Sequence, residues 1–453
     1  MSFPFRLHTH VALLTGLCLV TGGGARGGWG AEPPPAPATH DPQLLELAGR
    51  REVAALRRLE PPATLILEMG GVEVPRAAET LIEWGLPPEP RTGPYVVGQR
   101  GTRLAVTDWR VAGDQITLET SWSEPVVSER RALAAVVLAA PTDPAAGERQ
   151  LHDWLAGRNQ RDQLFLRGGD TLAGQILGWA AGTTTPEASP PENGNRKLRV
   201  ELARGEVTVP EEGLAAVVWR TPPTTVVSAA APAWRFGLQD GSLLSVARWE
   251  QTGAQVRLEL LERVTLTAPA DDLWSQLVYV QTSAPQVMWL SDLEPTGYKH
   301  VPFLTRTWPL GRDENVLGTS LRSGGRRWLK GLGMHSTSRS AYRLGGNFQS
   351  FHAELALDDE AGSGGSVEFR VYIARDDGQW QSAYASPVVR GGDPPLPLNL
   401  DVTGVQQLAL IVDAADQGDQ RDYANWLNAR LLRTTAPAGA PATESRPATR
   451  TER

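Results

Sequence analysis

The sequence has almost no cysteine, and it has few phenylalanine and tyrosine residues. Its 453 residues include one Cys, at Cys18, with 8 Phe and 7 Tyr against 15 Trp. If the segment that contains Cys18 is removed, the rest of the chain has no thiol. This excludes disulfides, cysteine-ligated zinc and a cysteine nucleophile, and leaves packing to stabilise the fold. Tryptophan serves both protein cores and sugar-binding surfaces, so its abundance does not choose between them.

An excess of basic charge and a long hydrophobic run are also missing. The formal net charge is -7 and the isoelectric point is near 5.6, which argues against a nucleic-acid partner. The apolar run Val11–Val20 is shorter than the ~20 residues that a membrane-spanning helix needs. Small residues follow it up to Gly30, so we predict a signal peptide over residues 1–30. We therefore predict that the protein is secreted or located in the periplasm or cell envelope, and that it has no membrane-spanning segment.

The sequence has none of the catalytic motifs for which we searched. No pair among its seven histidines has the spacing of zinc ligands on one element, and there is no Gly-x-Ser-x-Gly, phosphate-binding or dinucleotide-binding motif. We therefore predict that the protein is not an enzyme. Two alternatives stay open. A glycoside hydrolase needs two carboxylates about 5–9.5 Å apart, which a sequence cannot show, and the N-terminal region could supply them. The second alternative is a structural protein of the cell envelope, which would bind no small ligand.

Glycine and proline are abundant, with 46 and 35 residues, which indicates short strands joined by turns. Residues 31–60 begin as a proline-rich spacer. Leucine and valine then recur at a rough helical period, which predicts a short helix over residues 43–59. The tail, residues 434–453, has no apolar period and is predicted to be disordered.

Residues 61–285 contain three copies of one pattern, which we place at 61–145, 146–222 and 223–285. Each copy has a strand, a glycine-centred turn, an alternating strand and a closing apolar strand. This pattern predicts small barrel-like or hairpin β repeats. A connecting helix is expected near residues 147–157, an inserted loop at 183–195 and a linker at 221–232.

The C-terminal third is organised around Lys330-Gly-Leu-Gly-Met-His335-Ser336, followed by alternating strands and a closing Asp422-Tyr-Ala-Asn-Trp426. This order of residues resembles the NPCBM family, a carbohydrate-binding module associated with glycosyl hydrolase family 98, over residues 286–433. The resemblance implies a galactose-binding-like jelly-roll β-sandwich and a glycan ligand, with a galactose-type sugar as the first candidate. The expected fold is all-β, with small β repeats before this sandwich.

Four residues are the predicted sugar-binding site: His335, Asp422, Asn425 and Trp426. An indole can stack on a sugar face while short polar side chains bond its hydroxyls. We expect His335 to donate and Trp426 to stack, although Trp426 could equally fill the sandwich core. Alternative stacking platforms and residues that could orient the same loop edge are Trp308, Trp328, Trp380, Asp313 and Asn315.

An acidic loop follows the last alternating strand. Asp413, Asp416 and Asp419 recur at three-residue intervals in a loop that contains glycine. Calcium binds six to eight oxygens from such flexible loops. The sequence therefore leaves two interpretations, a structural Ca²⁺ site or a solvated acidic loop, and no other cofactor is expected.

Overall fold

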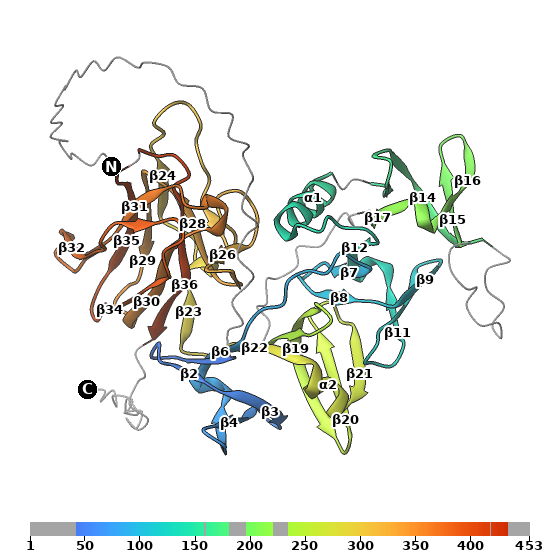
Figure 1. Ribbon diagram of the computed structural model, residues 1–453, viewed down its shortest axis with the longest axis horizontal. Coiled ribbons are helices and arrows are strands. Elements are labelled where there is room, and N and C mark those ends of the chain that lie inside the picture. The colour runs from blue at the N-terminus through green and yellow to red at the C-terminus, as the bar shows by residue number, and fades with distance from the viewer. Residues whose placement is uncertain (1–41, 158–159, 181–195, 221–233, 417, 434–453) are drawn as a thin grey trace, which may run out of the picture. The chain divides into compact units, whose positions relative to one another are not determined.

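The computed structural model describes residues 42–157, 160–180, 196–220, 234–416 and 418–433 (Figure 1). The predicted signal peptide, the loop at 183–195, the linker at 221–232 and the C-terminal tail lie outside these residues. Strands dominate the described part, which has two α-helices, α1 Pro144–Ala156 and α2 Ala270–Gln276. The predicted all-β class, with β repeats before a C-terminal β-sandwich, is confirmed. In the described ranges no helix is long and apolar enough to cross a membrane.

The N-terminal region contains four copies of one unit, one more than the sequence pattern showed. Each copy has five or six strands, with a single helical turn or a short helix directly before the closing strand. The first two are β1 Gln43–Glu46, β2 Arg51–Val53, β3 Ala55–Glu60, β4 Thr64–Met69, β5 Val72–Ala77 and β6 Leu81–Gly85, then β7 Tyr95–Gly98, β8 Arg103–Ala105, β9 Asp108–Ala112, β10 Gln115–Glu119, β11 Val126–Glu129 and β12 Leu133–Val137. The others are β13 Asp162–Leu166, β14 Thr171–Trp179, β15 Lys197–Leu202, β16 Gly205–Pro210 and β17 Leu214–Val218, then β18 Trp234–Leu238, β19 Leu243–Thr252, β20 Gln255–Leu260, β21 Thr265–Pro269 and β22 Leu277–Thr282.

One glycine turn recurs after the first strand of every repeat. Gly49, Gly101, Gly169 and Gly241 have φ of +87°, +86°, +92° and +88°. In this left-handed region a side chain is unfavourable. In each turn the glycine N–H donates to the carbonyl three residues earlier, at 3.0–3.4 Å. The glycines that punctuate the sequence are therefore required by backbone geometry.

The closing strands join the repeats in two pairs. β6 of the first repeat pairs antiparallel with β22 of the fourth, with Trp84 opposite Val280. β12 of the second pairs in the same way with β17 of the third, with Val136 opposite Val217. Each closing strand also pairs with the first strand of its own repeat. The apolar closing strands therefore lie inside the sheet, which explains why they lack polar alternation.

The predicted helix over residues 43–59 is wrong. This segment forms β1, β2 and part of β3, and its turn is centred on Gly49. Leu44 and Leu45 are both buried, because β1 lies between β2 and β6 and both of its faces are covered. Two neighbouring buried leucines imitate a helical period in the sequence. The connecting helix predicted near 147–157 is confirmed as α1, which Asp143 caps by accepting from the Ala146 N–H.

The C-terminal β-sandwich has two six-stranded sheets. One contains β25 Gly311–Arg312, β28 Gly331–His335, β36 Tyr423–Arg433, β30 Phe348–Leu357 and β34 Leu396–Asp401 in this order, with β23 Val287–Trp289 also on β36. The other contains β24 Gly297–His300, β29 Ser338–Arg343, β35 Gln407–Ala414, β31 Ser366–Ala374 and β32 Trp380–Ala385, with β33 Val389–Arg390 on β31. Val367, Phe369 and Val371 alternate into the core between the sheets. A separate hairpin, β26 Leu321–Ser323 and β27 Arg326–Trp328, packs on the outer face of the first sheet.

Candidate functional site

Aromatic rings gather where β28 ends and β36 begins. His335, the last residue of β28, lies opposite Tyr423, the first residue of β36, and their ring centroids are 5.9 Å apart. Trp308, from the segment between β24 and β25, stacks on His335 at 4.8 Å with an interplanar angle of 5°. Trp308 and Tyr423 are half-buried. We call Trp308, His335 and Tyr423 the edge site.

Strand β24 holds Trp308 in place through the tryptophan backbone. The Tyr298 hydroxyl donates to the Trp308 carbonyl at 3.1 Å, and the Trp308 N–H donates to His300 Nδ1 at 3.3 Å. His300 Nε2 in turn donates to the Ser336 carbonyl at 3.1 Å. These bonds leave the indole side chain free for contacts of its own.

His335 is a neutral hydrogen-bond acceptor in this arrangement. Its Nδ1 lies 2.7 Å from the Ser336 carbonyl, which can only accept, so the proton is on Nδ1. Burial is the largest influence on the ring, and it lowers the pKa of His335 despite that hydrogen bond. Nε2 is then unprotonated. The sequence predicted that His335 donates to a sugar, but the structure uses its Nδ1–H donor on the Ser336 carbonyl.

Arg306 covers the other face of the Trp308 indole. Its guanidinium carbon lies 3.8 Å from the ring centroid, so the indole lies between His335 and an arginine. Arg306 is exposed, and it forms no ion pair with a described residue. A guanidinium that rests on an indole without a carboxylate partner can be displaced by a ligand that stacks better.

Asp422 is a buried support of this edge. One of its oxygens accepts from the Ser336 hydroxyl and the other from the Ser366 N–H, the latter at 2.9 Å. Burial raises the pKa of Asp422 to about 6, although both hydrogen bonds act in the opposite direction. The side chain is 0% exposed. Asp422 therefore positions the residues that follow His335 and does not reach a ligand itself.

Trp426 is part of the sandwich core, so its predicted role as a stacking platform is wrong. Its side chain is 0% exposed and its ring meets Phe369 edge-on at 5.0 Å. Side chains alternate along β36, so Ala424 and Trp426 face the core while Tyr423 and Asn425 face the other side. The alternative weighed from the sequence, that Trp426 fills the sandwich, is the one that the structure supports.

Asn425 is also buried, and it does not join the edge site. Its Nδ2 donates to Asp358 at 2.8 Å, and Asp358 also accepts from the Arg322 N–H at 3.1 Å. Burial raises the pKa of Asp358 to about 6. Of the four predicted sugar-binding residues, the structure thus leaves only His335 at the edge site.

The alternative stacking platforms and the two polar residues expected to orient the loop edge do not join the edge site either. Trp328 is 4% exposed and lies under the guanidinium of Arg326, whereas Trp380 is half-buried on β32 of the second sheet. Asp313 accepts from Lys330 Nζ at 2.8 Å. This contact lies at the start of β28, and His335 lies at the other end of the strand, about 13 Å away. Asn315 accepts from the N–H groups of its own turn. Asp313 and Asn315 therefore do not orient the loop edge that carries His335.

The acidic loop does not gather its carboxylates. Asp413 lies 3.4 Å from Arg370, and Asp416 pairs with Arg390. Asp419 acts electrostatically on His335. Among the described residues no group of three or more His, Cys, Asp or Glu side chains could hold a metal ion. The calcium site stays a prediction from sequence, and this geometry does not fit it.

Tyr423, His300 and Arg306 were not predicted from the sequence as part of a site. The register that brings His335 and Tyr423 together is a property of sheet pairing between strands far apart in the chain. Trp308 was considered only as an alternative platform.

A comparison with known families finds a match for the residues that form the sandwich. Residues 286–432 match the NPCBM/NEW2 domain. The edge site, contributed by β28, β36 and the segment before β25, lies within the NPCBM/NEW2 domain. The match covers the C-terminal third of the chain and leaves the four repeats unassigned.

One curated relative aligns with part of the chain. It is named "Putative endo-alpha-N-acetylgalactosaminidase", from Renibacterium salmoninarum, and is 31% identical over 115 residues. The alignment covers 25% of this chain and 7% of that protein. The chain therefore spans a small fraction of the relative it matches.

Solved structures with some likeness include family 51 carbohydrate-binding modules (CBM51) of Clostridium perfringens. The CBM51 of a GH95 protein in complex with methyl-galactose is 21% identical, with a TM-score of 0.28, and covers 32% of this chain and 99% of that one. The CBM51-2 and INT domains of ZmpB with GlcNAc are 20% identical, with a TM-score of 0.29 and 42% of each chain covered. At these scores the likenesses carry no argument about the ligand.

Proposed function

We propose that the protein is a secreted, non-catalytic glycan-binding protein, and that its NPCBM/NEW2 domain binds a carbohydrate at the edge site. The observation that supports this best is the Trp308 indole, held by its backbone on β24 with one face on His335 and the other under a displaceable arginine. A sugar that replaces Arg306 would stack on the indole. His335, stacked on the opposite face of the indole, would support this platform from behind. The family match supports carbohydrate as the ligand class.

The expected affinity for a single sugar is low. Aromatic stacking contributes about 1 kcal/mol beyond the buried area, and each neutral hydrogen bond contributes about 0.5–1.5 kcal/mol. A total near 4 kcal/mol corresponds to a dissociation constant of about 1 mM. Useful binding then requires a polymeric ligand or several copies. Galactose and N-acetylgalactosamine are the first sugars to test, because the curated relative is named for an N-acetylgalactosaminidase.

The test is a glycan array probed with the full chain displayed in several copies. Trp308→Ala should lose binding about ten-fold or more, because avidity multiplies the loss of one stacking contact. Trp380→Ala is the matched control, since this half-buried indole lies on β32 of the other sheet, and it should bind like the parent. Equal binding by the parent and Trp308→Ala, both folded, would place the site elsewhere. A parent that binds no glycan would refute the proposal, and a parent that cleaves its glycan would replace it with the glycoside hydrolase alternative.

Trp426→Ala tests whether the Trp426 side chain belongs to the sandwich core or to the binding site. Removing an indole that is fully buried should lower the free energy of unfolding by about 3–5 kcal/mol, as measured by urea denaturation. Trp308→Ala should cost far less stability, because Trp308 is half-buried. If Trp426→Ala is as stable as the parent but fails to bind, Trp426 contacts the ligand and the edge site is misplaced.

A further inference from the structure

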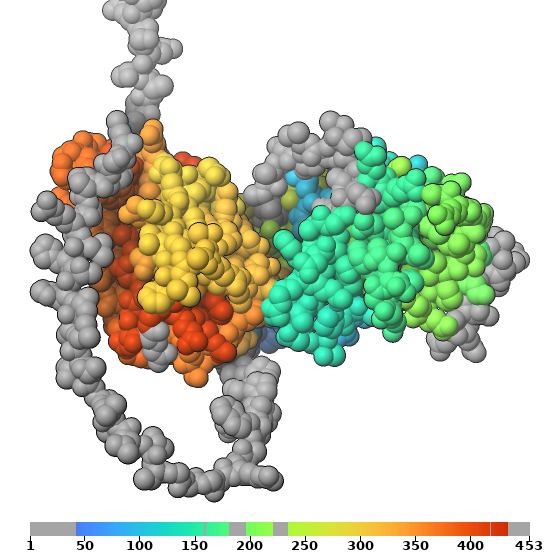
Figure 2. All heavy atoms as spheres, turned by 90° about the horizontal axis from the view of Figure 1, so that it is seen from above, coloured from blue at the N-terminus to red at the C-terminus, as the bar shows by residue number. Residues whose placement is uncertain are grey.

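A cavity of about 300 Å³ lies away from the edge site, where helix α1 meets the sandwich. Its lining comes from three parts of the chain: Tyr95 and Arg103 of the second repeat, Glu148 of α1, and the sandwich residues Ser320 and Arg327. In Figure 2 the teal surface that includes α1 adjoins the orange surface of the sandwich. Neither the family match nor the predicted sugar site accounts for this cavity.

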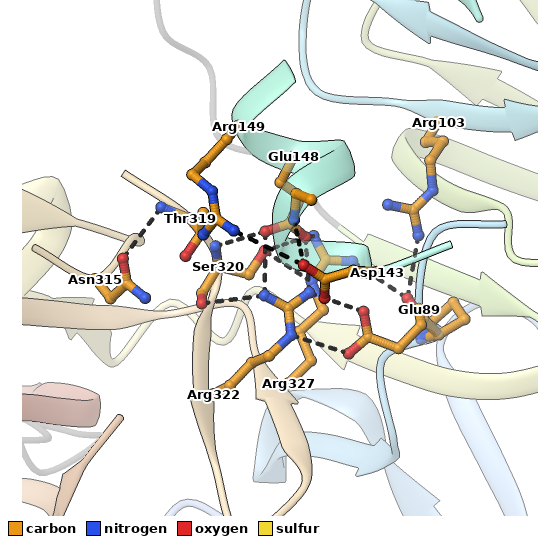
Figure 3. Close-up of polar contacts among 12 residues, drawn as sticks. Glu89, Arg103, Asp143, Glu148, Arg149, Asn315, Thr319, Ser320, Arg322 and Arg327 are labelled. Carbon is orange, nitrogen blue, oxygen red and sulfur yellow. Dashed lines mark hydrogen bonds and ion pairs between the residues drawn. The ribbon is translucent and has the colours of Figure 1, made fainter. Parts of the chain in front are cut away.

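Polar contacts fix the walls of the cavity. The Glu148 carboxylate accepts from the Ser320 N–H at 2.7 Å and from the Ser320 hydroxyl at 2.8 Å (Figure 3). Arg322 donates to Glu148 at 2.9 Å and to Glu89 at 2.8 Å. The repeats and the sandwich are therefore joined by charged hydrogen bonds on both sides of Arg322.

Two guanidiniums in the lining are oriented by neutral acceptors. Arg103 donates to the carbonyls of Gly241 at 3.0 Å and Pro88 at 3.1 Å. Arg327 donates to the same Pro88 carbonyl at 3.2 Å and to the Ser320 hydroxyl at 3.0 Å. Arg103 forms no ion pair with any residue in the described ranges. Burial, followed by the charge of Arg327, lowers the pKa of Arg103 to about 9, as expected for cations held close together.

The carboxylates in the lining form an ion pair with Arg327 but not with Arg103. Glu148 pairs most closely with Arg322, at 2.9 Å, and lies 3.8 Å from Arg327. Asp313 pairs with Lys330 at 2.8 Å, and Lys330 lies outside the cavity lining. Arg103 therefore carries a positive charge with which no described carboxylate pairs.

Tyr95 provides a second, independent sign of a ligand. Its side chain is 4% exposed and it lines the cavity, yet its hydroxyl makes no hydrogen bond within the described residues. The hydroxyl oxygen keeps some accessible surface, so it is available to a group in the cavity. A donor without a partner beside two guanidiniums suits the oxygen atoms of an anion.

We propose that this cavity binds the carboxylate or sulfate group of a molecule of monosaccharide size, such as an acidic sugar. Arg103 and Arg327 hold the anionic oxygens, and the Tyr95 hydroxyl donates a further hydrogen bond. The volume lies at the small end of the ~300–1,000 Å³ typical of ligand sites, which fits one sugar and excludes a long chain. The proposal does not depend on the edge site.

The test is calorimetric titration of the full chain with glucuronate and with galactose 6-sulfate, at low ionic strength. At least one of them should bind more tightly than neutral galactose and than inorganic sulfate. Arg103→Gln should weaken this binding about ten-fold or more, because it removes charge-assisted hydrogen bonds. Arg257→Gln is the matched control, because it removes a half-exposed guanidinium on β20, and it should bind like the parent.

Tyr95→Phe keeps the ring and removes only the hydroxyl, so it covers the case in which Arg103→Gln does not fold. It should weaken anion binding several-fold while leaving glycan retention at the edge site unchanged. The proposal is overturned if neither acidic sugar binds the folded parent, if inorganic sulfate binds as tightly as both, or if folded Arg103→Gln or Tyr95→Phe binds like the parent.

Discussion

Two of the arginine–tryptophan contacts in this molecule have opposite consequences. At the edge site, Arg306 lies 3.8 Å from the Trp308 ring and is exposed. Where the repeats meet the sandwich, Arg326 lies 4.2 Å from the Trp328 ring, and this indole is 4% exposed. We call the edge site the open region, because its arginine is exposed to solvent. We call the contact between the repeats and the sandwich the closed region, because its indole is buried.

Charge compensation makes the difference. In the closed region, Arg326 pairs with Glu83 at 2.5 Å, and Arg51 of β2, which also faces Trp328, pairs with Glu354 at 2.5 Å. These contacts join the repeats to the sandwich, so moving Arg326 would take the nearest cation away from the buried carboxylate of Glu83. Arg306 has no such partner among the described residues. An arginine that is paired with a carboxylate stays on its indole and holds the repeats and the sandwich together. An arginine without a carboxylate partner can leave its indole, which a ligand can then contact.

The largest effect is expected for Glu83→Gln in the closed region. Glu83 also accepts from the Tyr279 hydroxyl at 2.9 Å and from Asn428 at 3.1 Å. Burial acts to raise the pKa of Glu83, but Arg326 and Arg51 outweigh it, and the net shift is downward. Removing this charge leaves the Arg326 guanidinium without a carboxylate partner, so the free energy of unfolding should fall by about 3–5 kcal/mol. Urea denaturation followed by circular dichroism measures the loss.

Glu206→Gln is the control for Glu83→Gln. It removes the same chemical group from an ion pair with Arg199 on the exposed hairpin of the third repeat, where little change in stability is expected. If Glu83→Gln unfolds at the same urea concentration as the parent, the closed region does not depend on its buried charges, and the contrast with the edge site disappears.

A smaller effect should appear as a pH dependence of the sandwich. The pKa of Asp422 is about 6 in the folded protein, against an ordinary value of 3.8. The folded state therefore binds the proton more tightly than the unfolded state. This contribution to stability is fully present below pH 3.8 and is lost as the pH rises through 6. It amounts to at most about 3 kcal/mol.

Asp422→Asn should remove part of the rise in stability seen when the parent is taken from pH 7 to pH 5. Asp401→Asn is its control, because hydrogen bonds from Thr403 lower the pKa of the exposed Asp401, which gives the opposite sign. Denaturant unfolding at both pH values measures the change. An Asp422→Asn variant with the parent's full pH dependence would mean that Asp422 is not the buried acid that supports the edge.

The sequence predicted the architecture better than it predicted the site. The glycine turns and the alternation of Val367, Phe369 and Val371 were readable because they reflect local backbone geometry and one buried face. The first repeat was missed because Leu44 and Leu45 are both buried. Trp426 was misplaced for a related reason. β36 is covered on both faces along most of its length, so its sequence does not alternate in polarity.

The site itself depends on contacts that no local pattern records. His335 was found through the family resemblance, but the indole beside it comes from a segment 27 residues earlier in the chain. The resemblance implied a sugar site without saying which tryptophan faces outward. That distinction requires the burial of each indole, which follows from sheet register and from the covering of the outer face by the β26–β27 hairpin and the repeats.

The smallest effect, and the one that bears most directly on the comparison, is expected for Arg306→Ala. If a neutral sugar must displace Arg306 from the Trp308 ring, binding costs the cation–π contact of about 0.5–1 kcal/mol that an exposed pair contributes. Removing the guanidinium should then strengthen binding of neutral galactose about two- to five-fold. Titration monitored by tryptophan fluorescence measures this, with Arg339→Ala, an exposed arginine on β29, as control. Weaker binding by Arg306→Ala would mean that the arginine contacts the ligand and is not displaced by it. The open region would then resemble the closed one, with the ligand taking the place that the carboxylate of Glu83 has beside Arg326.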